Sequence, residues 1–280
     1  MDTIPASAAA GLEGSFTFSQ SSLQDYSDCP RRFQLRYLER LVWPAVETEP
    51  VAETETRQRE GLQFHRMVQQ YFLGVPAGRL SPMAASTDMS RWWHNFVSSG
   101  PNLQGRSLRT EITLAATVGQ YRLVAKYDLL ALQSGTATVY DWKTYARRTR
   151  DEVLAARWQT RVYRALLVKA GSALNDGRPF RPSEISMVYW FAEFPGEPAT
   201  FDYDDAQYDR DWLAIRTLIE EISSTTSFPL TQDTRQCRFC VYRSLCDRGD
   251  KAGLSVESEE AGSEDGGFQL DFEQLNEVEF

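Results

Sequence analysis

Residues 111–145 read EITLAATVGQYRLVAKYDLLALQSGTATVYDWKTY, and their pattern is the main sequence evidence for the fold. The stretch contains three runs rich in apolar and β-branched residues, at 111–118, 121–132 and 137–145. Short polar segments that contain glycine separate these runs, and such segments are typical of turns. Because two strands joined by a tight turn pair in antiparallel fashion, the stretch predicts a three-stranded antiparallel meander.

The segments that follow predict a mixed sheet. Residues 151–170 (DEVLAARWQTRVYRALLVKA) have the composition of a helix with acidic residues at its start, which suits the helix dipole. Residues 185–194 (ISMVYWFAEF) read as a buried strand. Strand, helix and strand in succession imply a parallel crossover, so the predicted class is α/β with a mixed sheet. Further helices are expected near residues 20–28, 31–41, 57–73 and 205–222.

Length and composition place the chain among globular proteins. Its 280 residues are 42% hydrophobic and 25% charged, which is ordinary for a folded protein with a substantial core. No apolar run approaches the roughly 18 residues that a membrane span needs. The N-terminal residues lack the basic region and apolar core of a secretory signal. A cytoplasmic protein without a membrane partner is therefore expected.

Charge is distributed unevenly along the chain. The net charge is −9, but residues 251–280 hold nine acidic residues against one lysine. We therefore expect a disordered leader at 1–15, a folded body at 16–249 and a disordered acidic tail at 250–280. The body is nearly neutral, so local basic patches could still bind nucleic-acid phosphates. The candidate arginines are Arg31, Arg32, Arg36, Arg40, Arg147, Arg148 and Arg150.

The four cysteines predict a metal centre. Cys237, Cys240 and Cys246 are close enough in sequence for three thiolates to converge, and Cys29 is the only other cysteine. A disulfide would require an oxidising compartment, and nothing in the sequence signals export. Four thiolates suit either an iron–sulfur cluster or a tetrahedral zinc ion. Buried cysteines without a metal are the remaining alternative.

A second group of chemically informative residues lies at the end of the third predicted strand. Asp141 and Lys143 share one face of that strand, while Trp142 faces the opposite side. Asp128 lies on the preceding strand, where a hairpin would bring it opposite. Two converging carboxylates form a site for a hard cation such as Mg²⁺ or Mn²⁺, and a lysine beside them could offset charge that develops on a phosphate. The alternative is an exposed Asp–Lys pair at the rim of the sheet.

Short motifs flank this group in a definite order along the chain. They run from residue 19 to the cysteine triplet and span nearly the whole expected body. In sequence order the motifs are Ser19-x3-Leu23-x2-Tyr26-x2-Cys29-Pro30-x2-Phe33, Gly61-x3-His65, Asp128, Asp141-x-Lys143, Gln159-x3-Tyr163 and Cys237-x2-Cys240-x5-Cys246.

In their order and spacing these motifs resemble the PD-(D/E)xK nucleases of the RecB type. The resemblance is closest to the iron–sulfur branch, which includes the AddB nuclease domain and the CRISPR-associated RecB-like exonucleases. It implies a restriction-endonuclease-like core with a mixed central sheet flanked by helices. It also favours a [4Fe–4S] cluster over zinc, held by the four cysteines as a clasp between the N- and C-terminal segments. Two departures are Ala125, where glycine is usual three residues before Asp128, and the bulky Trp142.

The resemblance also implies roles for individual residues. His65, Asp128 and Asp141 would be metal ligands, and Lys143 the catalytic lysine. Gln159 and Tyr163 lie at i and i+4 on one helical face, where they can turn toward the lysine or the scissile strand. Glu111 on the first predicted strand is a further candidate for the same cleft.

The expected function is metal-dependent hydrolysis of DNA. The resemblance implies a Mg²⁺- or Mn²⁺-dependent exonuclease acting on single-stranded or unwound DNA ends in repair, recombination or CRISPR adaptation. A helicase partner would be a separate chain, since the sequence has no Walker-type phosphate loop, and a CRISPR-adaptation protein is the other partner considered. The alternative is a non-catalytic DNA-binding subunit of a helicase–nuclease complex, with a structural metal cluster.

Overall fold

The computed structural model describes residue 12 and residues 14–42 and 49–249. Most of the expected leader and the whole of the expected acidic tail at 250–280 lie outside the described residues. Within the described residues, no helix is both long enough and apolar enough to cross a membrane.

The predicted meander is confirmed. Strands β2 (Ser107–Val118), β3 (Tyr121–Gln133) and β4 (Thr136–Lys143) follow one another and pair in antiparallel fashion. Strand β5 (Ile185–Phe191) pairs in parallel with β4, so the predicted crossover and mixed sheet are also confirmed.

Two short strands complete the sheet and were not predicted. Strand β1 (Thr17–Ser19) pairs in parallel with β3, and β6 (Ala199–Asp202) pairs in antiparallel fashion with β5. Strands of three and four residues are too short to show an alternating pattern in the sequence, so pairing with the neighbouring strand defines them.

The sheet has an opening along one edge of β3. Its other edge pairs with β2 along almost the whole strand. On the open side, β1 pairs with residues 122–124 and β4 with residues 129–133. Residues 125–128 therefore have no strand partner on that side among the described residues. The Tyr163 hydroxyl instead donates a hydrogen bond to the Lys126 carbonyl across 2.7 Å, which satisfies one of these backbone groups.

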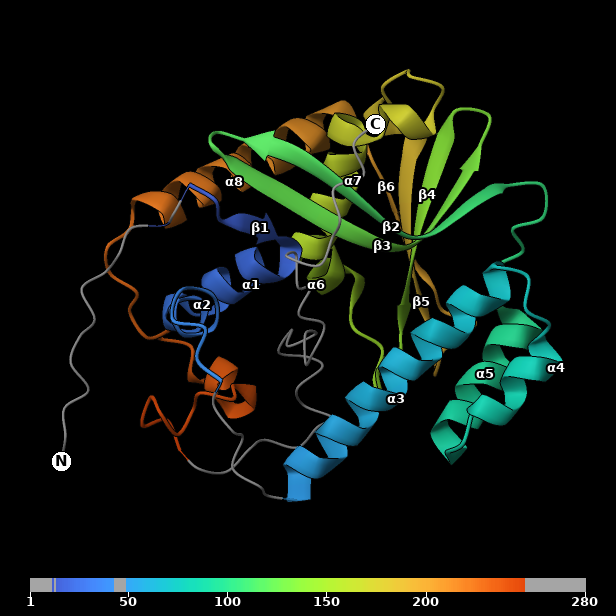
Figure 1. The fold of residues 1–280 in the computed structure, drawn as a ribbon, viewed down its shortest axis with the longest axis horizontal. Helices are drawn as coiled ribbons and strands as arrows, with labels where there is room; N and C mark the ends of the chain where they lie inside the picture. The colour runs from blue at the N-terminus through green and yellow to red at the C-terminus, as the bar shows by residue number, and fades with distance from the viewer. Residues whose placement is uncertain (1–11, 13, 43–48, 250–280) are drawn as a thin grey trace.

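Helices cover both faces of the sheet (Figure 1). Helices α1 (Gln20–Asp28), α7 (Trp158–Ala170) and α8 (Asp205–Ser224) bury their apolar residues in one core. Helices α3 (Glu49–Phe72), α4 (Ala77–Leu80) and α5 (Thr87–Ser99) pack in a second core on the opposite face. Short 3-10 helices span Ser81–Met83, Ser172–Leu174, Pro182–Glu184 and Thr234–Phe239.

Two predicted helices differ from the structure. Residues 151–170 form two helices, α6 (Asp151–Ala156) and α7, because Arg157 between them is extended, with φ −65° and ψ 145°. The Trp158 amide donates to the Gln24 side chain at 3.3 Å, so a tertiary contact marks the start of α7. The helix expected at residues 31–41 is instead α2 (Pro30–Phe33) followed by a π-helical turn, Gln34–Leu38.

Candidate active site and cysteine pocket

The predicted carboxylates lie at the opening in the sheet. The β3–β4 ladder ends at the pair Leu129 and Tyr140, so Asp128 and Asp141 follow one step beyond the last paired residues. The Trp142 amide donates to Asp128 Oδ2 across 3.2 Å. A carboxylate thus replaces a strand as the partner of that amide, where β3 and β4 diverge.

The alternation of side chains between the two faces of β3 is interrupted at Asp128. Leu123, Ala125 and Tyr127 belong to the first core, whereas Leu129 and Ala131 belong to the second. The regular alternation of a strand would keep residues 127 and 129 on the same face. The backbone is therefore irregular at the position that carries the carboxylate.

Glu111 lies across from this irregularity. Its neighbours Thr110 and Ile112 pair with Leu129 and Tyr127, which places Glu111 opposite Asp128. Its φ of 54° lies in the left-handed region, which is uncommon for a residue with a side chain. The Glu111 carboxylate forms an ion pair with Lys126. Glu111 therefore borders the site from β2, opposite Asp128.

Gln159 joins Lys143 to the carboxylate of Asp141. Lys143 Nζ donates to Gln159 Oε1 across 3.0 Å, and Gln159 Nε2 donates to Asp141 Oδ1 across 2.8 Å. Lys143 Nζ also lies 2.9 Å from Asp141 Oδ2. Because an ammonium can only donate and a carboxylate can only accept, these neighbours determine the orientation of the amide.

Two tyrosines hold this amide in place. Gln159 Nε2 donates to the Tyr163 hydroxyl at 3.4 Å, and the Tyr189 hydroxyl donates to Gln159 Oε1 at 3.2 Å. Tyr189 lies on β5 beside Asp141, and burial is the main factor that raises its pKa to about 12. Both phenols are therefore protonated at neutral pH. The sequence predicted Tyr163 near the lysine but gave no signal for Tyr189.

His65 approaches Asp128 from helix α3. Its Nδ1 lies 3.1 Å from Asp128 Oδ2. Burial alone would lower the pKa of His65, but the charge of Asp128 and their hydrogen bond raise it above its ordinary value. Reciprocally, burial would raise the pKa of Asp128, and His65 holds it below its ordinary value. The pair is thus polarised toward imidazolium and carboxylate.

Gly61 explains the spacing of the Gly61-x3-His65 motif. A Cβ at Gly61 would lie 3.0 Å from Thr144 Oγ1, the residue directly after Lys143. The Arg57 guanidinium donates to the Thr144 carbonyl at 3.2 Å from the same helix. Helix α3 therefore packs closely on the end of β4, which places His65 one turn further along, beside Asp128.

Asp141 has a different electrostatic environment from Asp128. Burial raises its pKa above the ordinary value even though Lys143 opposes that shift, and Asp128 adds a repulsive charge. The side chains of Asp141 and Lys143 are only 5% and 8% exposed. Trp142 lies between them in sequence and packs in the second core, so the predicted division between the two faces of β4 is confirmed.

The metal site is only partly assembled from the predicted ligands. In the part of the chain that the structure describes, no group of three or more His, Cys, Asp or Glu side chains is arranged to hold a metal ion. The side-chain contacts explain this, since His65 pairs with Asp128 while Lys143 and Gln159 occupy both oxygens of Asp141. The donor chemistry still fits a hard divalent cation, because two carboxylates lie at neighbouring positions on diverging strands.

Some of the arginines suggested as phosphate contacts have structural roles instead. Arg32 is 9% exposed and lies between Asp25 and Asp28, at 2.7 Å from each carboxylate. Arg36 also pairs with Asp25, at 3.0 Å. Such buried pairs link α1 to α2, so Arg32 does not present its charge to a ligand at the surface.

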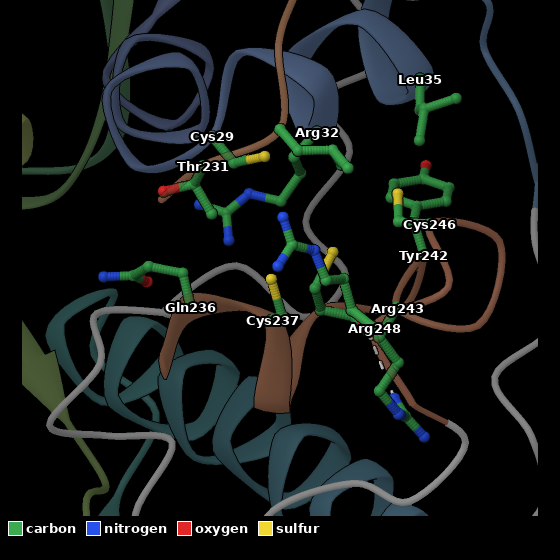
Figure 2. A pocket seen from close by; sticks show the side chains of 12 residues that line it. Cys29, Arg32, Leu35, Thr231, Gln236, Cys237, Tyr242, Arg243, Cys246 and Arg248 are labelled. Atoms are coloured by element: carbon green, nitrogen blue, oxygen red, sulfur yellow. Dashed lines mark hydrogen bonds between the residues drawn. The ribbon is translucent and has the colours of Figure 1, made fainter. Parts of the chain in front are cut away.

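The four cysteines line one pocket, together with Arg32 and Arg243 (Figure 2). Cys29 comes from the start of α2, while the other three come from the C-terminal segment that begins with the last 3-10 helix. None of the four forms a disulfide. The structure therefore brings both ends of the body together at this pocket, but among the described residues no three of the four thiols are arranged to hold one metal ion.

A known protein family and solved structures match the chain over most of its length. The PD-(D/E)XK nuclease superfamily matches residues 17–247. The crystal structure of SSO0001 matches with a TM-score of 0.40 and 14% identity, covering 85% of this chain and 87% of that one. The structure of a candidate exonuclease from Eubacterium rectale matches with a TM-score of 0.48 and 10% identity, covering 78% and 85%. Comparison with curated protein sequences gives no significant match.

Replacing Lys143 with methionine should destabilise the metal-free protein. The change removes the cation that faces buried Asp141 and leaves two carboxylates in one site, so we expect a loss of about 3–5 kcal/mol in the free energy of unfolding at neutral pH. Without Lys143, folded Asp141 would hold its proton to higher pH than an unfolded aspartate. The loss should therefore shrink as the pH falls.

Urea unfolding in a chelating buffer between neutral and mildly acidic pH measures this effect. Lys169→Met is the matched control. Lys169 lies at the C-terminal end of α7, and its Nζ is 4.8 Å from the centroid of the Trp212 ring on α8. An equal loss in both variants, or a Lys143→Met loss that grows on acidification, would contradict the electrostatic account.

Proposed function

The chain belongs to the PD-(D/E)XK nuclease superfamily, and from that premise we propose that it is a Mg²⁺- or Mn²⁺-dependent deoxyribonuclease. The observation that carries the proposal is the arrangement of Asp141, Lys143 and Gln159 beside Asp128, at the opening of the sheet. A structural Asp–Lys pair at a sheet rim would not need a half-buried amide that contacts both partners.

Asp128, Asp141 and His65 are the residues that would hold the divalent cation. When bound, such a cation supplies Lewis-acid activation of water and neutralises charge on the phosphodiester. The protein's own contribution is to hold the pKa of Asp128 low and to keep both carboxylates close to a fixed lysine. His65 performs the first task for Asp128, because its charge and hydrogen bond hold the pKa of that carboxyl low.

Lys143 is positioned to stabilise negative charge on the phosphate. Gln159 accepts from Nζ at 3.0 Å, and Tyr189 lies beneath the ammonium at 5.1 Å from its ring centroid. A donor fixed in advance stabilises developing charge more than a mobile one, because it does not reorganise during the reaction. Gln159 therefore acts through the lysine as a positioning residue.

We further propose that the substrate is a single-stranded or unwound DNA end. The support is the depth of the site, since the side chains of Asp141 and Lys143 are almost fully buried. A phosphate in an intact duplex could not reach such side chains as readily as one in a separated strand. We propose that the protein acts in repair, recombination or CRISPR adaptation. Its partner would be a helicase or a CRISPR-adaptation protein.

The activity is tested by digestion of labelled DNA with Mg²⁺ or Mn²⁺. Wild type should shorten linear single strands, and Lys143→Ala should lower the rate by about 100-fold or more, because it removes the fixed donor. Lys169→Ala should match wild type. If wild type leaves linear single strands, circular single strands and blunt duplexes intact with both metals, the non-catalytic DNA-binding alternative gains support. Cleavage of the circular strand would contradict the exonuclease mode.

We also propose that the four cysteines bind a [4Fe–4S] cluster. Support comes from their convergence on one pocket and from thiolates being the ligands that such clusters use. A cross-link from residue 29 to residue 237 would close nearly the whole body, which in the chain-entropy account contributes about 5 kcal/mol. The cluster would thus join the two ends of the body around the nuclease site.

Metal analysis of anaerobically purified protein tests the cluster. Wild type should be brown and contain iron and acid-labile sulfide in equal amounts, and Cys246→Ser should lose most of both because one of four ligands is missing. Lower thermal stability should accompany that loss. A colourless protein that contains zinc, or a Cys246→Ser variant that keeps its full iron content, would contradict the proposal.

A further inference from the structure

Arg157 is a second cation beside the candidate active site. It occupies the extended position between α6 and α7, directly before Trp158 and Gln159. Its exposed fraction is 6%, close to the 7% of Lys143. The sequence gave no reason to single it out, because it lies inside what reads as one continuous helix.

Arg157 and Lys143 flank the same aromatic ring. Lys143 Nζ lies 5.6 Å from the centroid of Tyr145, and Arg157 Cζ lies 5.9 Å from it. Arg157 Nη1 donates to the Tyr145 hydroxyl across 3.3 Å. Both cations therefore contact a single half-buried side chain, which lies two residues beyond the end of β4.

Arg157 lies close enough to Asp141 for the two charges to interact. Burial lowers its pKa, and the groups that oppose this shift include Asp141 and Asp28. A guanidinium nevertheless stays charged in proteins, so the fold keeps a buried cation here at a cost in solvation. A planar fork of N–H donors matches the oxygens of a phosphate, which a lysine ammonium does not.

We propose that Arg157 binds a non-bridging oxygen of a DNA phosphate at the active site, with Lys143 and Tyr145 beside it. This inference rests on the proposed nuclease function and adds a substrate-binding residue to it. The phosphate would be the scissile one or its immediate neighbour, since Gln159, which contacts Lys143, follows Arg157 by two positions. Tyr145 orients the guanidinium toward that position.

Arg157 has a second role to be separated from this one, namely holding the junction of α6 and α7. Arg164 is the matched control, because it lies on α7, the helix that begins directly after Arg157, and is 4% exposed. Its guanidinium donates to the carbonyls of Thr160 and Asp202, at 3.1 and 2.8 Å, and lies 4.3 Å from the Tyr203 ring centroid. It therefore joins elements away from the catalytic residues.

The first experiment measures steady-state cleavage of a labelled single strand by Arg157→Gln, Arg157→Lys, Arg164→Gln and wild type. We expect Arg157→Gln to lower kcat by about 100-fold, as loss of a charged donor to the reacting group does. Arg157→Lys should recover part of that loss. The alanine variants provide a rescue test. Free guanidinium ion should raise the cleavage rate of Arg157→Ala, where it can occupy the space left by the side chain, and should not raise that of Arg164→Ala.

The second experiment measures binding of a short single-stranded oligonucleotide in chelator, which needs no catalysis. Arg157→Gln should weaken binding by about tenfold, the effect of losing one charge-assisted hydrogen bond, and Arg164→Gln should not. If wild type cleaves DNA but Arg157→Gln keeps kcat and affinity within about twofold, the inference is wrong and the proposed function stands. If wild type cleaves nothing, the proposed function fails and the binding comparison alone decides the inference.

Discussion

Repulsion between the buried carboxylate of Asp141 and the half-buried carboxylate of Asp128 governs the arrangement of the site. Asp128 and Asp141 meet where β3 and β4 diverge, and a charge removed from water is costly unless it has a partner. The fold supplies one cation to each carboxylate, His65 from α3 and Lys143 from β4. The opening between β1 and β4 leaves room for these side chains, because no strand pairs with residues 125–128 on that side in the described chain.

The packing around the opening follows from this requirement. Helix α3 must lie close to the end of β4 for His65 to reach Asp128, and Gly61 permits that approach. Helix α7 must begin beside β4 for Gln159 to reach both Asp141 and Lys143, and the extended Arg157 sets its start. Side chains from α3, α7 and β5 thus complete a site whose two carboxylates and lysine come from β3 and β4.

The sequence predicted the parts of this arrangement that depend on local pattern. Turn residues and apolar runs gave the meander, and the alternation of a strand placed Asp141 and Lys143 on the face opposite Trp142. Helical spacing placed Gln159 and Tyr163 together, and the structure brings both to the lysine or its contacts.

Features that arise only from tertiary contacts could not be predicted in this way. The break at Arg157 has no glycine or proline to signal it and coincides with a hydrogen bond from the Trp158 amide to Gln24. Tyr189 reads as an ordinary residue of a buried strand, although its hydroxyl contacts Gln159. The sequence likewise does not show that the alternation of side chains is interrupted at Asp128, because the residues that follow, 129–132, are all apolar. Each of these becomes informative only when the neighbouring element is known.

The most direct test of the account is Mn²⁺ binding in the absence of DNA, followed by electron paramagnetic resonance. Asp141→Asn keeps the size of the side chain but removes a ligand charge, and Asp209→Asn is the control at an exposed position on α8. If the paired carboxylates form the cation site, wild type and Asp209→Asn should bind Mn²⁺ alike, and Asp141→Asn should bind at least about tenfold more weakly. Equal Mn²⁺ affinity in all three proteins would contradict the account.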